Sequence, residues 1–256
     1  MKPLDYSLDR EVLIRARRAT VFRFFTDSAR FADWWGAGST IEGRVGGRVR
    51  IVMPGNTIAL GEVLEMVTEE CVVFSYGFEA PGMPIPPGGS RVTVTLRDHA
   101  EGTLLRLHHE FADAGARDHH VQGWRYQLAV FANVAAAHEH AQLAARLDQW
   151  FQAWGEPDSD SRAAALLACA TDGVTFRDAY SCTAGRADLE AHLAAVVIHM
   201  PGVRLRRVGE VRQCQGAALV DWEAIGADGQ VRGRGTNFVG VASDGRIATV
   251  VGFWSK

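Results

Sequence analysis

Hydrophobic and polar residues follow two different periodicities along the chain. Between residues 10 and 115 they alternate in short runs separated by turns containing glycine, proline or aspartate, which is typical of β-strands. Two short helices are expected after the first strand, at 21–26 and up to Trp35, and the proline- and glycine-rich stretch 81–89 predicts a long loop. The alternating runs predict strands at 11–16, 39–45, 48–53, 59–66, 71–78, 91–97 and 103–111.

The period becomes helical in the middle of the chain. Apolar residues such as Trp124, Leu128 and Phe131 recur at three- and four-residue intervals, and neither glycine nor proline occurs again before Gly155. We therefore predict either one long helix or two helices that meet at a kink near 135–141. The elements expected after this stretch are helices at 159–170 and 186–200 and strands at 173–180, 203–214, 217–226, 231–241 and 246–254.

Composition excludes several classes of partner. The 256 residues are long for one domain and sufficient for two. Cationic residues number 27 and anionic residues 30, and neither half has a basic excess, so we expect no nucleic-acid partner. No apolar run approaches the roughly 18 residues that a membrane helix needs, and no membrane partner is expected. The four cysteines, which share no CxxC spacing, predict small buried thiols in a reducing cytoplasm: Cys71, Cys169, Cys182 and Cys214.

The histidines are clustered without metal-ligand spacing. Six of the nine lie at 108–109, 119–120, 138 and 140. Adjacent residues of a strand point to opposite faces, and residues two apart on a helix face different directions. No HExxH motif occurs. We therefore predict no metal site and no cofactor.

Glycine and tryptophan motifs occur in a regular order in the first half: Trp-Trp-Gly at 34–36, Gly-Gly at 46–47, Gly-Thr at 102–103 and Gly-Trp at 123–124. With these motifs, residues 8–138 resemble the family of homologues of the activator of heat-shock-protein-90 ATPase, within the START-like (SRPBCC) superfamily. The resemblance implies a helix-grip fold, in which a curved antiparallel sheet wraps a long helix around a cavity. It also implies binding of a small apolar molecule and, as an alternative, a stress-related co-chaperone with a heat-shock chaperone as partner.

One predicted strand of the first half directs a histidine inwards. Alternation along 104–111 places His109 on the same face as Leu105 and Leu107. We expect His109 to lie in the cavity as a polar ligand-binding group. The alternative is a core histidine that bonds to a backbone carbonyl. The aromatic ligand-binding residues expected beside it are Trp34, Trp35, Tyr76 and Trp124.

A different set of motifs marks the second half, at 150–154, 171–178, 185–186, Trp222 and 243–247. With them, residues 142–256 resemble the SnoaL-like and ketosteroid-isomerase-like group of the nuclear-transport-factor-2-like superfamily. The resemblance implies a cone of strongly curved sheet packed on helices, with a pocket at the open end. We therefore predict an α+β protein of two domains, a helix-grip domain at 1–140 and a cone-shaped domain at 141–256.

A carboxylate ends an apolar strand face in this second half. Val174, Phe176 and Asp178 alternate onto one face, and in ketosteroid isomerases the strand at this position carries the proton-abstracting aspartate. An apolar environment raises the pKa of a carboxyl group towards neutrality, which suits a general base that works near neutral pH. The resemblance thus implies a catalytic role for Asp178. The alternative is a strand-end aspartate that accepts backbone N–H bonds.

The Asp-Gly turns at 228–229 and 244–245 set the register of the last three strands. Asp221 then lies opposite Thr236, and Thr236 opposite Phe253. The isomerase pattern on Thr236 places this face in the pocket and offers Asp221 as a catalytic acid. The ligand-binding residues expected in the second half are Trp150, Phe176, Thr236, Phe238 and Phe253.

Two features limit or extend this interpretation. Trp150 or a neighbour stands where ketosteroid isomerases carry an oxyanion-stabilising tyrosine, and Thr236 replaces their second oxyanion acid, so steroid isomerisation is not expected. Trp222 and Trp254 flank Gly235 on the opposite face and predict an apolar patch for a homodimer or for packing against the helix of the first half. The leading hypothesis is binding of a small hydrophobic molecule in one or both cavities. The alternatives are a proton-transfer or hydration enzyme and a protein-interaction module.

Overall fold

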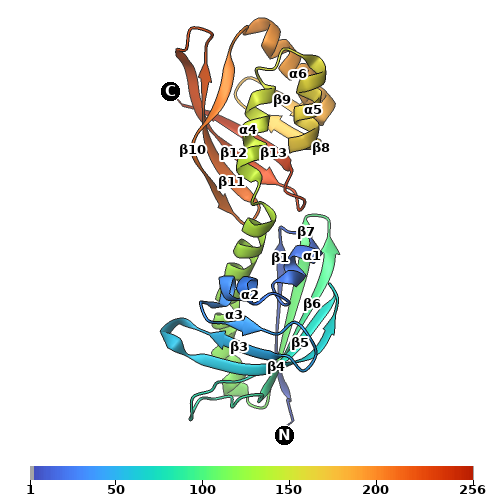
Figure 1. Cartoon of the computed structure of the whole chain (residues 1–256), viewed down its shortest axis with the longest axis vertical. Helices are drawn as coiled ribbons and strands as arrows, with labels where there is room; N and C mark the ends of the chain where they lie inside the picture. The colour runs from blue at the N-terminus through green and yellow to red at the C-terminus, as the bar shows by residue number, and fades with distance from the viewer. Residues whose placement is uncertain (1–2, 256) are drawn as a thin grey trace. The chain divides into compact units, whose positions relative to one another are not determined.

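The computed structural model describes residues 3–255, and the chain forms two compact units, Met1–His138 and Glu139–Lys256. The boundary thus lies two residues before the predicted one. Each unit has one sheet, its own helices and its own hydrophobic core (Figure 1). The predicted α+β class is therefore confirmed.

The described residues of the first unit form a seven-stranded antiparallel sheet in the order β1-β7-β6-β5-β4-β3-β2. Helix α2 (Ser28–Trp35) begins where it does because the Asp27 carboxylate accepts from the backbone N–H of Ala29 at 2.8 Å. Helix α1 is Arg18–Arg23, and a 3-10 turn, η1, is Pro54–Asn56. The strands are β1 (Tyr6–Ile14), β2 (Thr40–Ile41), β3 (Arg48–Val52), β4 (Ile58–Val67), β5 (Cys71–Tyr76), β6 (Ser90–His99) and β7 (Gly102–Phe111).

The long helix α3 (Ala114–Glu139) provides the apolar stripe that packs in this core. It begins ten residues before Trp124, the first apolar residue of the predicted helical pattern, because the Asp113 carboxylate accepts the N–H of Ala116 at 2.9 Å and a helix tolerates an exposed glycine at Gly123. Helix α4 begins at Leu143, so the chain has two helices here, the second of the two predicted alternatives. The buried residues of α3 include Trp124, Leu128, Phe131 and Ala135, at helical spacing.

The described part of the second unit has a six-stranded mixed sheet in the order β10-β11-β12-β13-β8-β9. Strands β8 and β13 pair in parallel, and this pairing was not predicted. The short strand β9 (Cys182–Ala184) was also missed. The other elements are α4 (Leu143–Ala153), α5 (Ser159–Cys169), β8 (Ala170–Arg177), α6 (Arg186–His199), β10 (Arg204–Cys214), β11 (Ala217–Ile225), β12 (Val231–Val241) and β13 (Ile247–Trp254).

The predicted hairpin register is confirmed. Asp221 pairs with Thr236, Trp222 pairs with Gly235, and Gly235 also pairs with Trp254. Gly229 and Gly245 have φ of 77° and 81°, the left-handed conformation that these tight turns require. The alternation of residues on the last three strands is therefore as expected.

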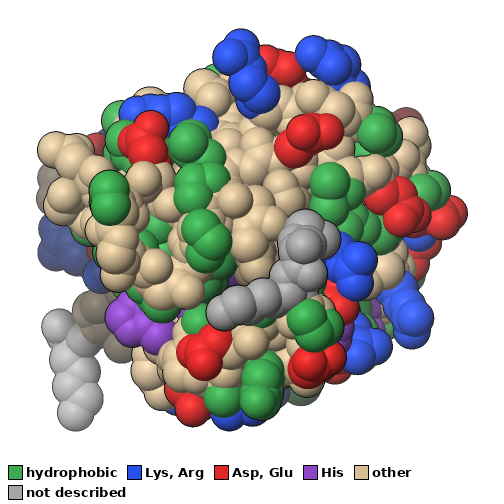
Figure 2. Space-filling view, turned by 90° about the horizontal axis from the view of Figure 1, so that it is seen from below, with side chains coloured by type: hydrophobic (Ala, Val, Ile, Leu, Met, Phe, Trp, Pro, Cys, Tyr) green, Lys and Arg blue, Asp and Glu red, His purple; other side chains and the backbone are tan. Residues whose placement is uncertain are grey.

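The cysteines correct one prediction. All four are free, and Cys169 is buried, but Cys182 and Cys214 are exposed because they lie in strands at the two edges of the second sheet. Among residues 3–255, no helix is long and apolar enough to cross a membrane. On the face seen in Figure 2, acidic and basic side chains are interspersed.

Candidate functional site

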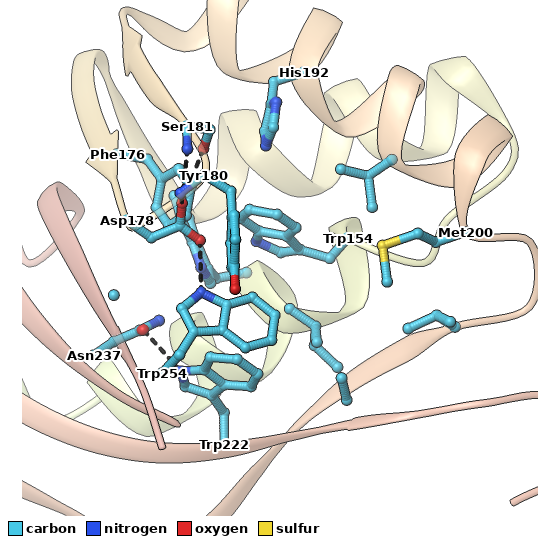
Figure 3. A pocket seen from close by; sticks show the side chains of 16 residues that line it. Trp154, Phe176, Asp178, Tyr180, Ser181, His192, Met200, Trp222, Asn237 and Trp254 are labelled. Carbon is cyan, nitrogen blue, oxygen red and sulfur yellow. Dashed lines mark hydrogen bonds between the residues drawn. The ribbon is translucent and has the colours of Figure 1, made fainter. Parts of the chain in front are cut away.

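A cavity of about 370 Å³ lies in the second unit between helices α4 and α6 and the inner face of the sheet (Figure 3). Sixteen residues line it, and most of its wall is apolar. The aromatic members of the wall are Trp150, Trp154, Phe176, Tyr180, Trp222 and Trp254.

Two indoles from neighbouring strands form one side of the cavity. The rings of Trp222 and Trp254 meet edge to face, with centroids 4.9 Å apart. A Cβ atom at Gly235 would lie 2.5 Å from the Trp222 ring, and one at Gly233 would lie 2.8 Å from the Trp254 ring. Strand β12 thus presents glycines where the indoles pass over it, which lets both rings lie close to the backbone.

Hydrogen bonds fix the orientation of both indoles. Trp222 Nε1 donates to Asn237 Oδ1 at 2.8 Å, and Trp254 Nε1 donates to Asp178 Oδ2 at 3.0 Å (Figure 3). Asn237 is buried in β12. Trp222 is buried, so its indole N–H needs such a partner, whereas Trp254 is 39% exposed and its bond to Asp178 orients the ring at the edge of the cavity.

The carboxylate of Asp178 is held by its own loop as well. Its Oδ1 atom accepts the backbone N–H groups of Tyr180 and Ser181, both at 2.8 Å. Asp178 directly follows β8, so these bonds close an Asx-type turn. The arrangement contains both features weighed for this residue: backbone capping on one oxygen, and a place on the cavity wall for the other.

Three nitrogen-bearing rings gather around Phe176 on the other side of the cavity. His192, on α6, is half-buried, and its ring centroid is 6.2 Å from that of Phe176 and 5.7 Å from that of Trp154. Phe176 also lies 4.9 Å from Trp154 and 6.3 Å from Trp150. Within the described part of the chain, the indole N–H groups of Trp150 and Trp154 are buried and have no hydrogen-bond partner.

In the first unit, the predicted histidine belongs to a closed hydrogen-bond chain. Trp124 Nε1 donates to His109 Nδ1 at 2.9 Å, so the neutral ring carries its proton on Nε2, which donates to Ser90 Oγ at 2.9 Å. The Ser90 hydroxyl donates to the backbone carbonyl of Tyr76 at 2.9 Å. Burial holds the pKa of His109 well below its usual value, so the ring stays neutral.

A smaller pocket of about 240 Å³ lies beside this chain. Trp35, Tyr76 and Trp124 line it together with His120, which the sequence interpretation missed. His120 Nδ1 lies 2.7 Å from the carbonyl of Ala116, one helical turn earlier, and burial lowers the pKa of its ring. Burial also raises the pKa of the Tyr76 hydroxyl.

Comparisons with known proteins assign both units. Residues 15–136 match the family described as "Activator of Hsp90 ATPase homolog 1-like protein" (AHSA1), and residues 147–250 match the SnoaL-like domain. An AHSA1-like protein from Rhizobium etli is 31% identical, and the match covers 51% of this chain and 82% of that one, with a TM-score of 0.42. The chain belongs to the AHSA1-like family and carries a SnoaL-like domain after it. Both resemblances inferred from the sequence are thereby confirmed.

Two further structures are similar to single domains. A SnoaL-like family protein from Agrobacterium tumefaciens is 24% identical, with 46% of this chain and 99% of that chain covered and a TM-score of 0.42. The Aha1 protein from Colwellia psychrerythraea, solved as a dimer, is 16% identical, with 48% and 90% covered and a TM-score of 0.41. No curated protein matches the chain.

The structure reverses the predicted faces of the SnoaL-like sheet. Trp222 and Trp254 line the cavity, whereas Phe238 and Phe253 are 37% and 59% exposed on the outer face, where Thr236 also lies. The reason is the parallel pairing of β8 with β13, which places Phe176 beside Val250. On β13, Val250 therefore points to the inner face of the sheet, and Phe253, three residues later, points to the outer face. The three predicted ligand residues on the outer face do not line the cavity.

Asp221, the second predicted catalytic carboxylate, also lies on the outer face of the sheet. Asp221 Oδ1 accepts the hydroxyl of Thr236 at 2.5 Å, and Arg212 lies 3.6 Å from its other oxygen. Asp221 is absent from the cavity lining, so it does not pair with Asp178. The geometry is that of a surface cross-strand cluster.

The AHSA1-like domain also corrects two placements. Trp34 and His109 are buried but do not line its pocket, whereas Trp35, Tyr76 and Trp124 do. The core alternative for His109 fits the geometry, with side chains of Trp124 and Ser90 as partners instead of a backbone carbonyl. Ligand binding by this pocket stays a prediction.

Several partner hypotheses remain predictions. The apolar patch expected to form a homodimer faces the cavity, and the exposed apolar residues of the outer sheet face instead include Leu219, Phe238 and Phe253. No group of His, Cys, Asp or Glu among the described residues could hold a metal ion. Nothing in the described residues tests a cofactor or a heat-shock chaperone as partner.

Some of the site residues that the sequence interpretation missed had a recognisable signal. Gly233 and Gly235 alternate on β12 beside Trp222 and Trp254, and strand glycines next to tryptophans indicate that the rings cross the backbone. Asn237 continues the same alternation. His192 had no such signal, because a single histidine on an amphipathic helix is most often a surface residue.

Proposed function

We propose that the SnoaL-like domain binds a small, largely apolar molecule in its aromatic cavity. The observation that supports this is the lining, in which six aromatic residues surround about 370 Å³, a volume in the range of ligand pockets. Burial of apolar ligand surface against this wall is favourable by about 25 cal/mol per Å². The few polar groups of the wall would orient the molecule.

The neutral dye N-phenyl-1-naphthylamine, which fluoresces in apolar surroundings, tests the proposal. We expect saturable binding at one site in a fluorescence titration of the full chain. Val196→Trp places an indole in the cavity, because Val196 lines it, and should remove most of the binding.

Val197→Trp is the matched control. Val197 is the next residue of α6, is half-buried like Val196, and does not line the cavity. This variant should bind the dye as the unmodified chain does. Dye binding that does not saturate, or an equal loss in the two variants, contradicts the proposal.

We propose proton transfer beside a carbonyl group as a second function, because one carboxylate stands on the cavity wall. Asp178 Oδ2 accepts one hydrogen bond, from Trp254, and a carboxylate oxygen can accept more than one. This oxygen would take a proton from the carbon next to a ligand carbonyl, while the electron pair moves to the carbonyl oxygen to form an enolate. The SnoaL-like relative from Agrobacterium tumefaciens carries a provisional isomerase name.

Exchange of the C2 protons of 1-tetralone in D2O, followed by NMR, tests this step. We expect the protein to accelerate the exchange and Asp178→Asn to remove about 100-fold or more of the acceleration. Asp221→Asn, on the outer sheet face, is the control and should keep the full rate. No acceleration over buffer, or equal rates in the two variants, removes this second candidate and leaves the binding proposal in place.

A further inference from the structure

The polar groups of the SnoaL-like cavity fall into two sets. The indole N–H groups of Trp222 and Trp254 are already bonded, to Asn237 and Asp178. Beside Phe176, the buried indole N–H groups of Trp150 and Trp154 have no hydrogen-bond partner among residues 3–255. One part of the lining, at Trp222 and Trp254, therefore has bonded indole N–H groups. The other part, at Trp150 and Trp154, has unbonded N–H groups, and we call it the open side.

The ring of His192 belongs to the open side. It extends from α6 toward Trp154 and Phe176, and it lines the cavity (Figure 3). No described residue forms a hydrogen bond with it, and its contacts are the faces and edges of Trp154 and Phe176, at 5.7 and 6.2 Å between centroids. A histidine ring has a nitrogen donor that is free to bond to a ligand.

The buried N–H groups of Trp150 and Trp154 would be stabilised by a hydrogen-bond acceptor. A buried N–H group that lacks a partner is unfavourable, and native proteins leave few of them. Trp150 is 1% exposed, so bulk solvent does not reach it. An occupant of the cavity that brings an oxygen atom to this side would restore the missing bonds.

The charge of the lining restricts the kind of oxygen. No lysine or arginine is among the residues that line the cavity, and Asp178 is an acidic residue. A carboxylate or phosphate would lose its hydration there without a cationic partner. The site suits a neutral acceptor.

We propose that His192 and the indole N–H of Trp154 form an oxygen-recognition end of the cavity, and that the ligand is a neutral ring compound with a ketone oxygen at that end. This inference rests on the proposed binding function and names the ligand class. The apolar body of the ligand contacts Trp222 and Trp254, and its oxygen accepts from His192 and Trp154. Both residues are specificity determinants of the binding site.

Two ligands with the same bicyclic skeleton test the proposal. 1-Tetralone carries a ketone where tetralin carries a methylene group, and 1-naphthoate supplies an anionic ring compound. Displacement of N-phenyl-1-naphthylamine from the full chain gives the three dissociation constants. We expect 1-tetralone to bind about tenfold more tightly than tetralin, the effect of about one good hydrogen bond, and 1-naphthoate to bind more weakly than tetralin.

Variants locate the preference. His192→Phe and Trp154→Phe should each reduce the ratio of the two constants to about threefold or less, while the tetralin constant changes by less than about twofold. His199→Phe is the matched control, because His199 lies in the last turn of the same helix, is exposed and does not line the cavity. It should keep the tenfold ratio.

An infrared measurement gives a readout that does not depend on the Trp154 variant being folded. The carbonyl stretch of bound 13C-labelled 1-tetralone should lie below its frequency in hexane, and His192→Phe should move it back toward that frequency. Equal binding of the two ligands, a ratio unchanged in both variants, or tighter binding of 1-naphthoate overturns the inference and leaves the binding function standing. Failure of both neutral ligands to displace the dye overturns the inference, and absence of saturable dye binding overturns the proposed function too.

Discussion

Two histidines, His109 in the AHSA1-like domain and His192 in the SnoaL-like domain, both lie beside tryptophans but differ in burial and in hydrogen bonding. His109 is fully buried, and both of its nitrogens are bonded, to Trp124 and Ser90. His192 is half-buried on a cavity wall, and no described residue bonds to it. The comparison teaches that a buried polar ring with complete bonds holds a core together, whereas one with open bonds beside a cavity is available for recognition.

The largest expected effect follows from removal of the bonded histidine. His109→Ala leaves the Trp124 indole without its acceptor and opens a cavity, so we expect the AHSA1-like domain to lose about 3 kcal/mol or more of unfolding free energy. Hydrogen exchange by mass spectrometry on the full chain measures this for peptides of β7. His108→Ala is the control on the same strand.

That control should change stability by less than about 1 kcal/mol, because His108 is partly exposed and bonds Asp9 at the surface. A similar loss in the two variants would mean that the buried chain does not stabilise the core. His109 would then not differ from a surface histidine in its contribution to the stability of the AHSA1-like domain.

At acidic pH we expect the two domains to lose different amounts of unfolding free energy, by a margin smaller than the effect of His109→Ala. Burial lowers the pKa of His109 and His120 in the AHSA1-like domain and of His140 in the SnoaL-like domain. Because the unfolded chain binds these protons more readily, stability is highest above about pH 6.5 and falls below it, by about 1.4 kcal/mol per pH unit for each such histidine until its folded-state pKa is reached.

We therefore expect a steeper acid loss in the AHSA1-like domain, which has two of the three histidines. Hydrogen exchange between pH 5 and 7.5, corrected for intrinsic exchange rates, compares peptides of β7 with peptides of β11. A steeper fall in the SnoaL-like domain would contradict the assignment of the neutral core histidines.

The smallest expected effect concerns the glycines beneath the indoles. A Cβ at Gly235 would lie 2.4 Å from the carbonyl oxygen of Phe253 as well as against Trp222, so Gly235→Ala should destabilise the SnoaL-like domain by about 2 kcal/mol and weaken dye binding. In Gly240→Ala, on the same strand, the nearest atom is 3.5 Å away. That variant should bind the dye normally, and equal effects would show that the indole packing does not shape the cavity.

Much of the fold follows from local sequence patterns. The strands, the hairpin register and the apolar stripe of α3 all depend on residues close together in the chain. Local patterns do not determine which face of the SnoaL-like sheet is the inner one. Trp222 and Phe238 are both apolar and lie on opposite faces, so the sequence is compatible with either arrangement. The deciding contact, β8 against β13, joins segments about 70 residues apart.

The candidate site was predictable to a smaller degree. Strand alternation, which depends on near neighbours, placed Phe176 and Asp178 on one face, and the resemblance to ketosteroid isomerases pointed to Trp150; all three line the cavity. The bond from Trp124 to His109, in contrast, follows from tertiary packing of α3 on β7. Alternation placed His109 on the inward face but did not distinguish a bonded core ring from a ring in a cavity.

The parallel pairing of β8 with β13 also sets the order of events during synthesis. Asp178 leaves the ribosome 76 residues before Trp254, the residue whose indole it binds. Until β13 arrives, β8 lacks its neighbour in the centre of the sheet, and such long-range closure is slow compared with formation of the local hairpins. The cavity should consequently be the last part of the SnoaL-like domain to mature, so a nascent chain that stalls within β12 would expose Phe176 and the indoles of α4 to solvent.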